Sequence, residues 1–330
     1  RFEHSLGVLH KFRNILDKSG SNINVSDEEA AIGEVLALFH DIGHGPYSHQ
    51  TEGRVGLDHN EMRYEIIRRK LRKQLEECGL SVDAVIDAFK SPLYELIEAV
   101  HGADKLDYIT RDEHHVFGSS YDIEPLLTWG FFNKEAGFCV SEKGTNALDA
   151  YVRKFYQMYG DVYWLKTNLI AESMLRRAML KAKKTNGMPE KLVEMGDVDL
   201  ERWLESEPSS AQILENLRAG SEALPKAAVV FKINGFEKRE VTEGKPITVV
   251  GIDKNKAERF PTERVGLRQI VEIERDLSSL FDTDVILSST PEPGRIRGID
   301  PKIYSVEKGV MRFSDIDPEY KTSNVGSHWA

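Results

Sequence analysis

The chain has 330 residues, of which 40% are hydrophobic and 30% charged, and its formal net charge is −10. This length allows one large domain, or one large domain with a smaller partner, around a substantial core. No apolar run in the sequence reaches the ~20 residues of a membrane-crossing helix, so a membrane protein is not expected. The acidic balance argues against the broad basic surface of non-specific nucleic-acid binding.

The cysteine content and the first residue bear on the cell compartment and on the extent of the chain. Cys78 and Cys139 are the two cysteines, too few for a disulfide framework or a cysteine zinc site, so we expect a reducing compartment, the cytoplasm. The sequence starts at Arg1 within a predicted helix, with neither an initiator Met nor a signal-peptide pattern. We therefore expect residues upstream of Arg1 to be missing.

Helical periodicity dominates the first half of the chain. Apolar residues recur every three or four positions over residues 2–16, which predicts a helix that Gly20 stops. A second helix is predicted from the N-cap Ser26 to about residue 43. A third is predicted from Ser91 and Pro92 to about His115.

The second half begins helical and then changes texture. The predicted elements are a helix over residues 147–183, a loop at 206–210, strands at 229–233 and 247–252 joined by an Asn234-Gly235 hairpin, a helix at 267–281, a strand at 285–287 and a strand pair around Lys308-Gly309. We therefore expect a mainly α-helical bundle over residues 1–220 and an α+β appendage over residues 221–330.

Residues that carry chemistry concentrate near the end of the second predicted helix. His40 and Asp41 are followed by His44 and His49, which puts three histidines into ten residues around two glycines. Imidazole and carboxylate groups suit Zn, Mn or Fe, and carboxylates also suit Mg. This segment predicts part of a metal site, whose remaining ligands must come from other helices.

Three sequence blocks carry a family resemblance. Residues 1–8 read RFEHSLGV, residues 40–49 read HDIGHGPYSH and residues 104–112 read DKLDYITRD. In this order they resemble the signature blocks of deoxynucleoside triphosphate triphosphohydrolases of the HD superfamily, and the match extends over about the first 185 to 220 residues. The resemblance implies that His4, His40, Asp41 and Asp104 hold one divalent ion, for which Mg, Mn, Fe, Zn, Ni and Co remain open.

The resemblance also implies residues that bind substrate. Lys105 and Arg1 would contact phosphates, while Tyr108 and Asp112 would contact the sugar. Asp104, Tyr108 and Asp112 are spaced four apart, so on one helix they share a face. The alternative is an ordinary surface helix with an Asp107–Arg111 ion pair. Further candidates are His44, which is equally a turn residue, and Arg153, with Tyr163 and Lys166 weaker.

Proton transfer is assigned to His49. Glu52 lies three residues later, close enough on a helical turn to orient and charge the imidazole. His59 matches the next histidine of the family, but Asn60 stands where the family usually has glutamate, which leaves position 60 without an assigned role. The alternative is that His49 and Glu52 form a surface pair. The other histidines, His10, His101, His114, His115 and His328, are expected at the surface or in the core.

The function expected from these residues is metal-dependent hydrolysis of a (deoxy)nucleoside triphosphate to nucleoside and tripolyphosphate. The alternatives are another HD phosphohydrolase reaction, on nucleoside monophosphates, cyclic dinucleotides or alarmones, and a sensor that binds nucleotide without turnover. A nuclease is disfavoured by the acidic chain. The expected partners are a nucleotide and further copies of the chain in a homo-oligomer, with residues 221–330 serving assembly or regulation.

Overall fold

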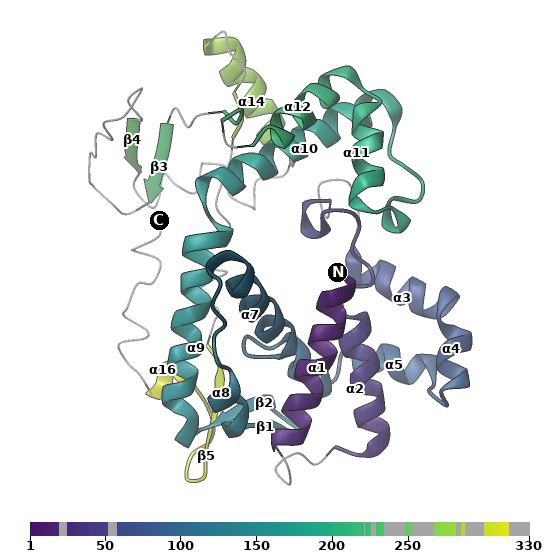
Figure 1. Cartoon of the computed structure of the whole chain (residues 1–330), viewed down its shortest axis with the longest axis vertical. Helices are drawn as coiled ribbons and strands as arrows, with labels where there is room; N and C mark the ends of the chain where they lie inside the picture. The colour runs from purple at the N-terminus through teal and green to yellow at the C-terminus, as the bar shows by residue number, and fades with distance from the viewer. Residues whose placement is uncertain are drawn as a thin grey trace. The chain divides into compact units, whose positions relative to one another are not determined.

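The computed structural model describes residues 1–19, 25–51, 58–220, 222–225, 229–233, 248–252, 267–281, 285–287 and 300–316. The fold is mainly α-helical, as predicted, and its described strands form two small sheets (Figure 1). Contacts divide the chain into two compact units. The first unit is Arg1–His44, Leu57–Tyr159 and Ile299–Ser323, and the second is Gly45–Gly56, Gly160–Gly298 and Asn324–Ala330.

The first unit consists of helices and one sheet. Its helices are α1 (Phe2–Ser19), α2 (Asp27–Phe39), α3 (His59–Lys70), α4 (Arg72–Glu77), α5 (Val82–Ala88), η3 (Pro92–Tyr94), α6 (Glu95–Glu98), α7 (Ala103–Phe117), α8 (Glu124–Trp129), η4 (Glu142–Gly144), α9 (Thr145–Met158) and α16 (Phe313–Ile316). Its strands are β1 (Gly130–Asn133), β2 (Gly137–Ser141), β5 (Lys302–Ser305) and β6 (Gly309–Arg312).

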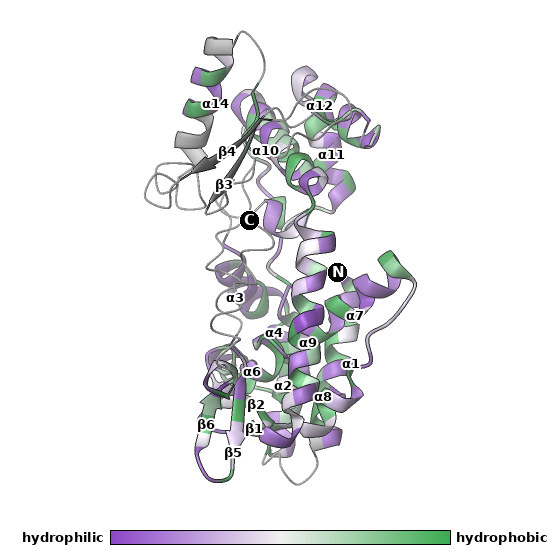
Figure 2. Ribbon diagram, turned by 90° about the vertical axis from the view of Figure 1, so that its left-hand side faces the viewer, coloured by the Kyte–Doolittle hydropathy of each residue, from purple (hydrophilic) through white to green (hydrophobic). Residues whose placement is uncertain are grey.

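Helices α1 and α2 form as the sequence predicts. Val8, Phe12 and Ile15 of α1 are fully buried, and α1 contacts α2 and α7. The predicted apolar face is only partly the packed one, because Phe12 is buried whereas Phe2 and Leu6 are 77% and 44% exposed. The described helices carry hydrophobic and hydrophilic residues on different sides (Figure 2). Ser26 caps α2 in a capping box with Glu29, which satisfies amide groups at the start of the helix.

The third predicted helix is wrong as a single element. The chain forms η3 and α6, breaks at residues 99–102, and starts again as α7. Ala99 is extended, with ψ of 157°, and Gly102 is the extended N-cap of α7. A Cβ at position 102 would press against the backbone of Ile97, so glycine allows this close approach. The break places Asp104 in the first turn of α7.

The sheet joins segments that lie far apart in the sequence. Its strand order is β1-β2-β5-β6, with β1–β2 and β5–β6 antiparallel and β2–β5 parallel. In the central pair, Val140 aligns with Ile303. The predicted strand pair around Lys308 and Gly309 is confirmed as β5 and β6, whereas the sequence reading missed β1 and β2. The domain boundary at residue 220 stays a prediction.

The described part of the second unit is mainly helical. It contains η2 (Ser48–Gln50), α10 (Lys166–Asn186), η6 (Leu192–Glu194), α11 (Asp197–Glu205), α12 (Pro208–Arg218), β3 (Val229–Ile233), β4 (Thr248–Ile252) and α14 (Leu267–Phe281). Helix α10 packs on α11 and α12, and Met179, Leu204 and Leu214 are among the buried side chains. The predicted helix at 267–281 is confirmed.

Two helix-level predictions for residues 147–218 need correction. The single helix over 147–183 is α9 and α10, separated by the π-helical turn η5 (Tyr159–Tyr163) and by Leu165, which is extended with ψ of 139°. The predicted loop at 206–210 is only a short bend. Glu207 caps α12 by accepting from the amide of Ser210, and Pro208 occupies the first turn, where its missing N–H costs nothing.

Two strand predictions also need correction. Strands β3 and β4 exist, but they pair in parallel, which a two-residue hairpin cannot connect; Asn234 and Gly235 lie outside the described residues. Residues 285–287 form no strand. Side chains satisfy their backbone instead, because Arg176 donates to the carbonyl of Leu287 and Glu274 accepts from its amide.

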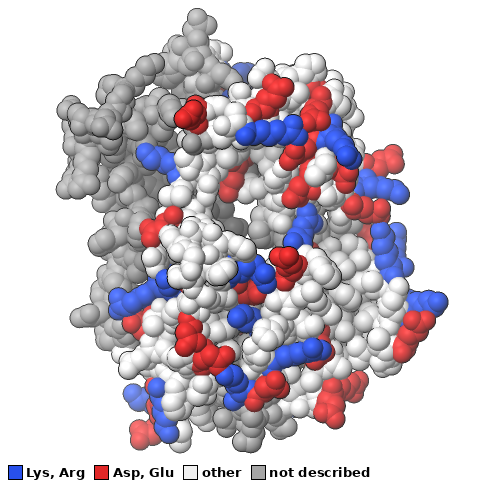
Figure 3. Space-filling view, in the orientation of Figure 1, with Lys and Arg blue, Asp and Glu red and all other residues white. Residues whose placement is uncertain are grey.

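Charge and hydropathy of the described residues agree with the composition. Lys and Arg side chains are interspersed with Asp and Glu on the face shown in Figure 3. Among the helices that the structure describes, none has the length and apolar character to span a membrane.

Candidate metal centre

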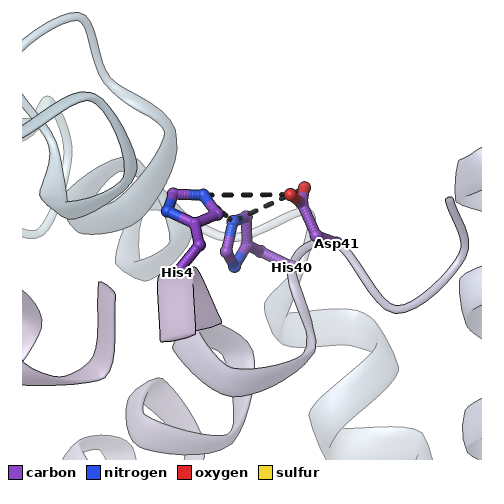
Figure 4. Close-up of side chains that lie close together, drawn as sticks. All are labelled: His4, His40 and Asp41. Atoms are coloured by element: carbon purple, nitrogen blue, oxygen red, sulfur yellow. Dashed lines mark hydrogen bonds and ion pairs between the residues drawn. The ribbon is translucent and has the colours of Figure 1, made fainter. Parts of the chain in front are cut away.

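Three predicted ligands converge at the ends of two helices in the first unit. His4 lies in the first turn of α1, His40 is the C-cap of α2, and Asp41 follows it. One ligand atom from each lies within 4.8 Å of the others, which makes a group that can hold a metal ion. Figure 4 shows the two imidazole rings and the carboxylate of Asp41 turned toward one another.

Asp104, the fourth predicted ligand, reaches the same point from the first turn of α7. Its Oδ1 lies 3.2 Å from Nε2 of His4 and 3.9 Å from Nε2 of His40. The two Nε2 atoms are 3.3 Å apart, and Oδ1 of Asp41 is 3.4 Å from Nε2 of His40. Ligands in adjacent positions ~2.1 Å from a metal lie ~3 Å apart, so these spacings fit one ion.

Hydrogen bonds fix which nitrogen of each histidine faces the cluster. Nδ1 of His40 lies 2.8 Å from the carbonyl of Ala37, and Nδ1 of His4 lies 2.8 Å from Oδ2 of Asp107. Both partners only accept, so each Nδ1 carries the proton and donates. When a divalent ion is bound, each Nε2 would direct its lone pair to that ion, which is the arrangement that metal-ligating histidines require.

Asp107 has a role beyond the ion pair with Arg111 that its spacing on the helix predicts. The pair exists, since Arg111 donates through Nε and Nη2 at 3.0 Å, but the same carboxylate also accepts from His4. Gly7 makes this approach possible, because a Cβ there would collide with the carboxylate of Asp107. The sequence contains one indication of this role, because Asp107 follows Asp104 by three residues and so lies on the same face of α7.

The cluster is electrostatically prepared for a cation. Burial favours the neutral form of His4, but hydrogen bonds to Asp104 and Asp107 outweigh it and raise its pKa to about 9. Burial opposes ionisation of Asp104, yet His4 and Lys105 lower its pKa to about 2. The pKa of Asp41 is also lowered, by His44, His40 and His4 against burial. Three carboxylates thus favour positive charge here, which a divalent metal supplies.

A buried arginine stabilises the C-terminal end of α2. Arg63 of α3 donates to the carbonyl of His40 at 2.7 Å and to Oδ1 of Asn60 at 2.6 Å, with its guanidinium 4.2 Å from the ring centre of Phe89. Asn60 therefore has a structural partner here. Gly43 allows α3 to approach, because a Cβ at that position would collide with the carbonyl of His59.

The substrate residues predicted on α7 lie along the helix that carries Asp104. Nζ of Lys105 is 2.8 Å from Oδ2 of Asp104, so one cationic side chain sits at the cluster. The hydroxyl of Tyr108 lies 3.1 Å from that of Tyr159, and both Tyr108 and Asp112 are half-buried. The spacing of four residues places Asp104, Tyr108 and Asp112 on one helix face, as predicted.

The structure places the remaining candidates of this unit differently. Buried His44 contacts the cluster, because its Nε2 lies 3.2 Å from Oδ1 of Asp41, and Arg1 donates to the carbonyl of His44 at 2.6 Å. His59 stacks on His44 with ring centres 4.5 Å apart. Arg153 is 76% exposed and pairs with Asp149 one turn earlier in α9.

His49 and Tyr163 belong to the second unit, which is described by itself. His49 is exposed in η2, and Glu52 lies outside the described residues, so their pairing stays a prediction. Tyr163 lines an open pocket of about 490 Å³ with Tyr47, Gln50 and residues of α10, α11 and α12. Lys166 begins α10.

The other described histidines lie at the surface or in the core, as expected. His10 bonds Asn14 at the surface, His101 is buried against Phe138, and His114 and His115 are exposed near the end of α7. His328 lies outside the described residues.

Comparison with known proteins identifies the domain that holds the cluster. The HD domain family matches residues 1–113, and the HD associated region matches residues 131–269. The chain therefore contains an HD domain followed by an HD associated region. Its HD domain contains His4, His40, Asp41 and Asp104, and HD domains bind divalent metals, so the cluster is the candidate metal group of this chain.

The chain is also similar to known proteins and to a solved structure. An uncharacterised protein of Methanocaldococcus jannaschii is 26% identical over 96% of this chain, which spans 64% of that relative. Human deoxynucleoside triphosphate triphosphohydrolase SAMHD1 is 24% identical over 55% of this chain and 37% of that protein. A phosphohydrolase of Bacteroides thetaiotaomicron has a similar fold, with a TM-score of 0.62 at 17% identity over 96% of this chain and 82% of that chain.

Proposed function

We propose that this HD protein hydrolyses deoxynucleoside triphosphates at the α-phosphorus, giving nucleoside and tripolyphosphate. The observation that carries the proposal is the convergence of His4, His40, Asp41 and Asp104, with Lys105 beside them. Two imidazoles and two carboxylates fit one divalent ion, which would polarise a phosphoryl oxygen and lower the pKa of a bound water. The distant similarity to SAMHD1 supports the choice of substrate class.

The side chains around the cluster have separate tasks in this proposal. Lys105 and Arg1 bind the phosphates and neutralise the charge that develops on their oxygens. Tyr108 and Asp112, on the face of α7 that carries Asp104, bind the sugar, with Asp112 accepting from its 3′-hydroxyl. Asp107 holds the ring of His4 in the orientation that exposes Nε2.

The leaving group needs a proton, which we assign to His49. Cleavage of the bond between the α-phosphorus and the 5′-oxygen expels an alkoxide, a poor leaving group unless it is protonated as the bond lengthens. Glu52 orients His49 in this proposal, and His59 is the next candidate donor.

A nucleotide panel tests the function. The purified chain is incubated with deoxynucleoside triphosphates, nucleoside monophosphates, cyclic dinucleotides and a guanosine alarmone, each with Mg, Mn, Fe, Zn, Ni or Co, in water labelled with heavy oxygen. We expect nucleoside and tripolyphosphate, with the label in the tripolyphosphate. Orthophosphate or pyrophosphate would assign another HD phosphohydrolase reaction, and nucleotide binding without any product would assign a sensor.

Assembly and location belong to the same proposal. We expect a homo-oligomer to which residues 221–330 contribute, and light scattering of the full chain measures its mass. A monomer at all concentrations would contradict this expectation. We also expect a cytoplasmic location, where Cys78 and Cys139 would stay reduced.

A further inference from the structure

The segment that carries His49 contains two residues in an uncommon backbone conformation. Tyr47 has φ of 55° and ψ of 22°, and Ser48 has φ of 48°, so both are left-handed although neither is glycine. Such residues are strained and persist only where surrounding contacts hold them. The segment therefore needs stabilising contacts from other elements, and the second unit provides them.

Helix α11 supplies that support. The amide of Tyr47 donates to Oδ1 of Asp197 at 2.8 Å, and the hydroxyl of Tyr47 donates to the carboxylate of Glu201. Asp197 and Glu201 are four residues apart, so both carboxylates lie on one face of α11. Tyr47 is thus held at its backbone and at the end of its side chain.

Helix α12 completes the arrangement. Arg218 pairs with Glu201 and also with Glu205, whose Oε1 lies 2.6 Å from Nη1. Burial and the carboxylate of Glu201 raise the pKa of the Tyr47 hydroxyl far above its usual value, so it stays a donor. Tyr47 and Arg218 lower the pKa of Glu201, so it stays an acceptor. We call Tyr47, Asp197, Glu201 and Arg218 the Tyr47 latch.

We propose that the Tyr47 latch positions His49 for catalysis, an inference that rests on the proposed function of His49. Tyr47 precedes His49 by two residues, and η2 begins immediately after Tyr47. The segment belongs to the HD domain by sequence, whereas α11 and α12 belong to the HD associated region. The latch therefore gives the associated region a role in the reaction: it fixes the backbone of a histidine that the HD domain supplies.

A competing role for the same residues is ligand binding. Tyr47, Glu201 and Arg218 line the pocket of about 490 Å³ together with Gln50. Residues that bind substrate there would change KM when altered. A positioning residue instead changes kcat and leaves KM and the metal content alone.

The first experiment compares Tyr47→Phe with Glu205→Gln in the full chain. Tyr47→Phe removes only the hydroxyl, whereas Glu205→Gln alters the other partner of Arg218 and leaves Tyr47 bonded. We expect Tyr47→Phe to lower kcat about tenfold at unchanged KM and metal content, because a misplaced catalytic group is costly. Glu205→Gln should behave as the unaltered chain. An unchanged kcat, or a rise in KM alone, overturns the proposal.

The second experiment asks whether the effect passes through His49. If Tyr47 acts by placing His49, Tyr47→Phe should cost nothing further in a His49→Ala background, because residues that act as a unit are not additive. A further loss of about tenfold in that background would show a purely structural role and overturn the proposal.

Hydrogen exchange separates this inference from the proposed function. Amides of Ser48, Gln50 and Thr51 donate within the segment, so we expect them to exchange faster in Tyr47→Phe than in Glu205→Gln. If the unaltered chain releases no product from any nucleotide, the proposed function and the catalytic role of the latch both fail, while faster exchange still establishes the latch. Unchanged exchange overturns the latch itself.

Discussion

The metal cluster and the Tyr47 latch hold polar side chains by different means. In the cluster the side chains of His40 and Asp104 are 4% and 19% exposed, whereas in the latch those of Glu201 and Arg218 are 23% and 48% exposed. Charged contacts weaken with exposure because water screens them. The cluster should therefore be rigid by itself, while the His49 segment depends on contacts that single substitutions can loosen.

The largest effect is expected when a metal ligand of the cluster is removed. We expect His40→Ala and Asp41→Ala to abolish both bound metal and turnover, because the remaining ligands cannot close the site. Metal analysis of the purified variants and the nucleotide assay measure the two losses. His10→Ala is the matched control, since His10 is a histidine of α1 outside the cluster that bonds Asn14 at the surface. Full activity in metal-depleted His40→Ala would end the metal hypothesis.

Removing the proposed proton donor should separate chemistry from metal binding. We expect His49→Ala to keep its metal and nucleotide affinity but to lose at least ~100-fold in kcat, as is typical of a general acid. Glu52→Gln should lose less, because it only orients the donor. Steady-state kinetics with metal analysis checks both variants. A near-normal kcat in His49→Ala would reject this role and make His59 the next residue to test.

A smaller effect, on metal affinity, is expected from Asp107, which bonds the metal ligand His4. Asp107→Asn weakens the acceptor that orients His4, and loss of such a partner typically costs about 10- to 100-fold in metal affinity. Titration of metal-free protein with a divalent ion gives the dissociation constant directly. Asp17→Asn, an exposed change on α1, serves as the control. Equal affinities for all three proteins would show that His4 needs no orienting carboxylate.

The smallest effect concerns the stability of the first unit. Burial, with help from the charge of Lys302, lowers the pKa of His101 from 6.5 to about 3. Between these two pH values His101 binds a proton in the unfolded chain but stays neutral in the folded chain. The free energy of unfolding therefore decreases as the pH falls below about 6.5.

A neutral replacement isolates that contribution. Between about pH 7 and about pH 5, the unaltered chain should lose about 2 kcal/mol more free energy of unfolding than His101→Gln, at about 1.4 kcal/mol per pH unit. Urea unfolding at the two pH values measures the difference. Parallel losses in the two proteins would show that His101 is protonated in the folded state.

The sequence was most informative where one short motif determines both structure and chemistry. The apolar spacing of residues 2–16 and the N-cap Ser26 predicted the two helices, and the ends of these helices bring His4, His40 and Asp41 together. Asp104 joins them although its helix was wrongly extended back to Ser91. The error was harmless for the ligand, because Asp104 lies inside α7 in either case.

Other features depend on contacts that no local pattern contains. The break before α7 uses an extended Gly102 against the backbone of Ile97, and the surrounding residues still have helical periodicity. The acceptor role of Asp107 requires α1 to approach α7 at Gly7. The parallel pairing of β3 with β4 is a third such feature, because the composition of the two strands does not distinguish parallel from antiparallel pairing.

The pairing of β2 with β5 has a consequence for the order in which the protein can fold. Val140 aligns with Ile303, so the helices α10, α11 and α12 lie in the loop that this pairing closes. Closing a long loop costs chain entropy before the contacts that it permits are gained, which makes such pairing slow. During synthesis, the sheet beside the metal-bearing helices must wait for β5 to leave the ribosome, and until then the edge of β2 is open to pairing with another chain.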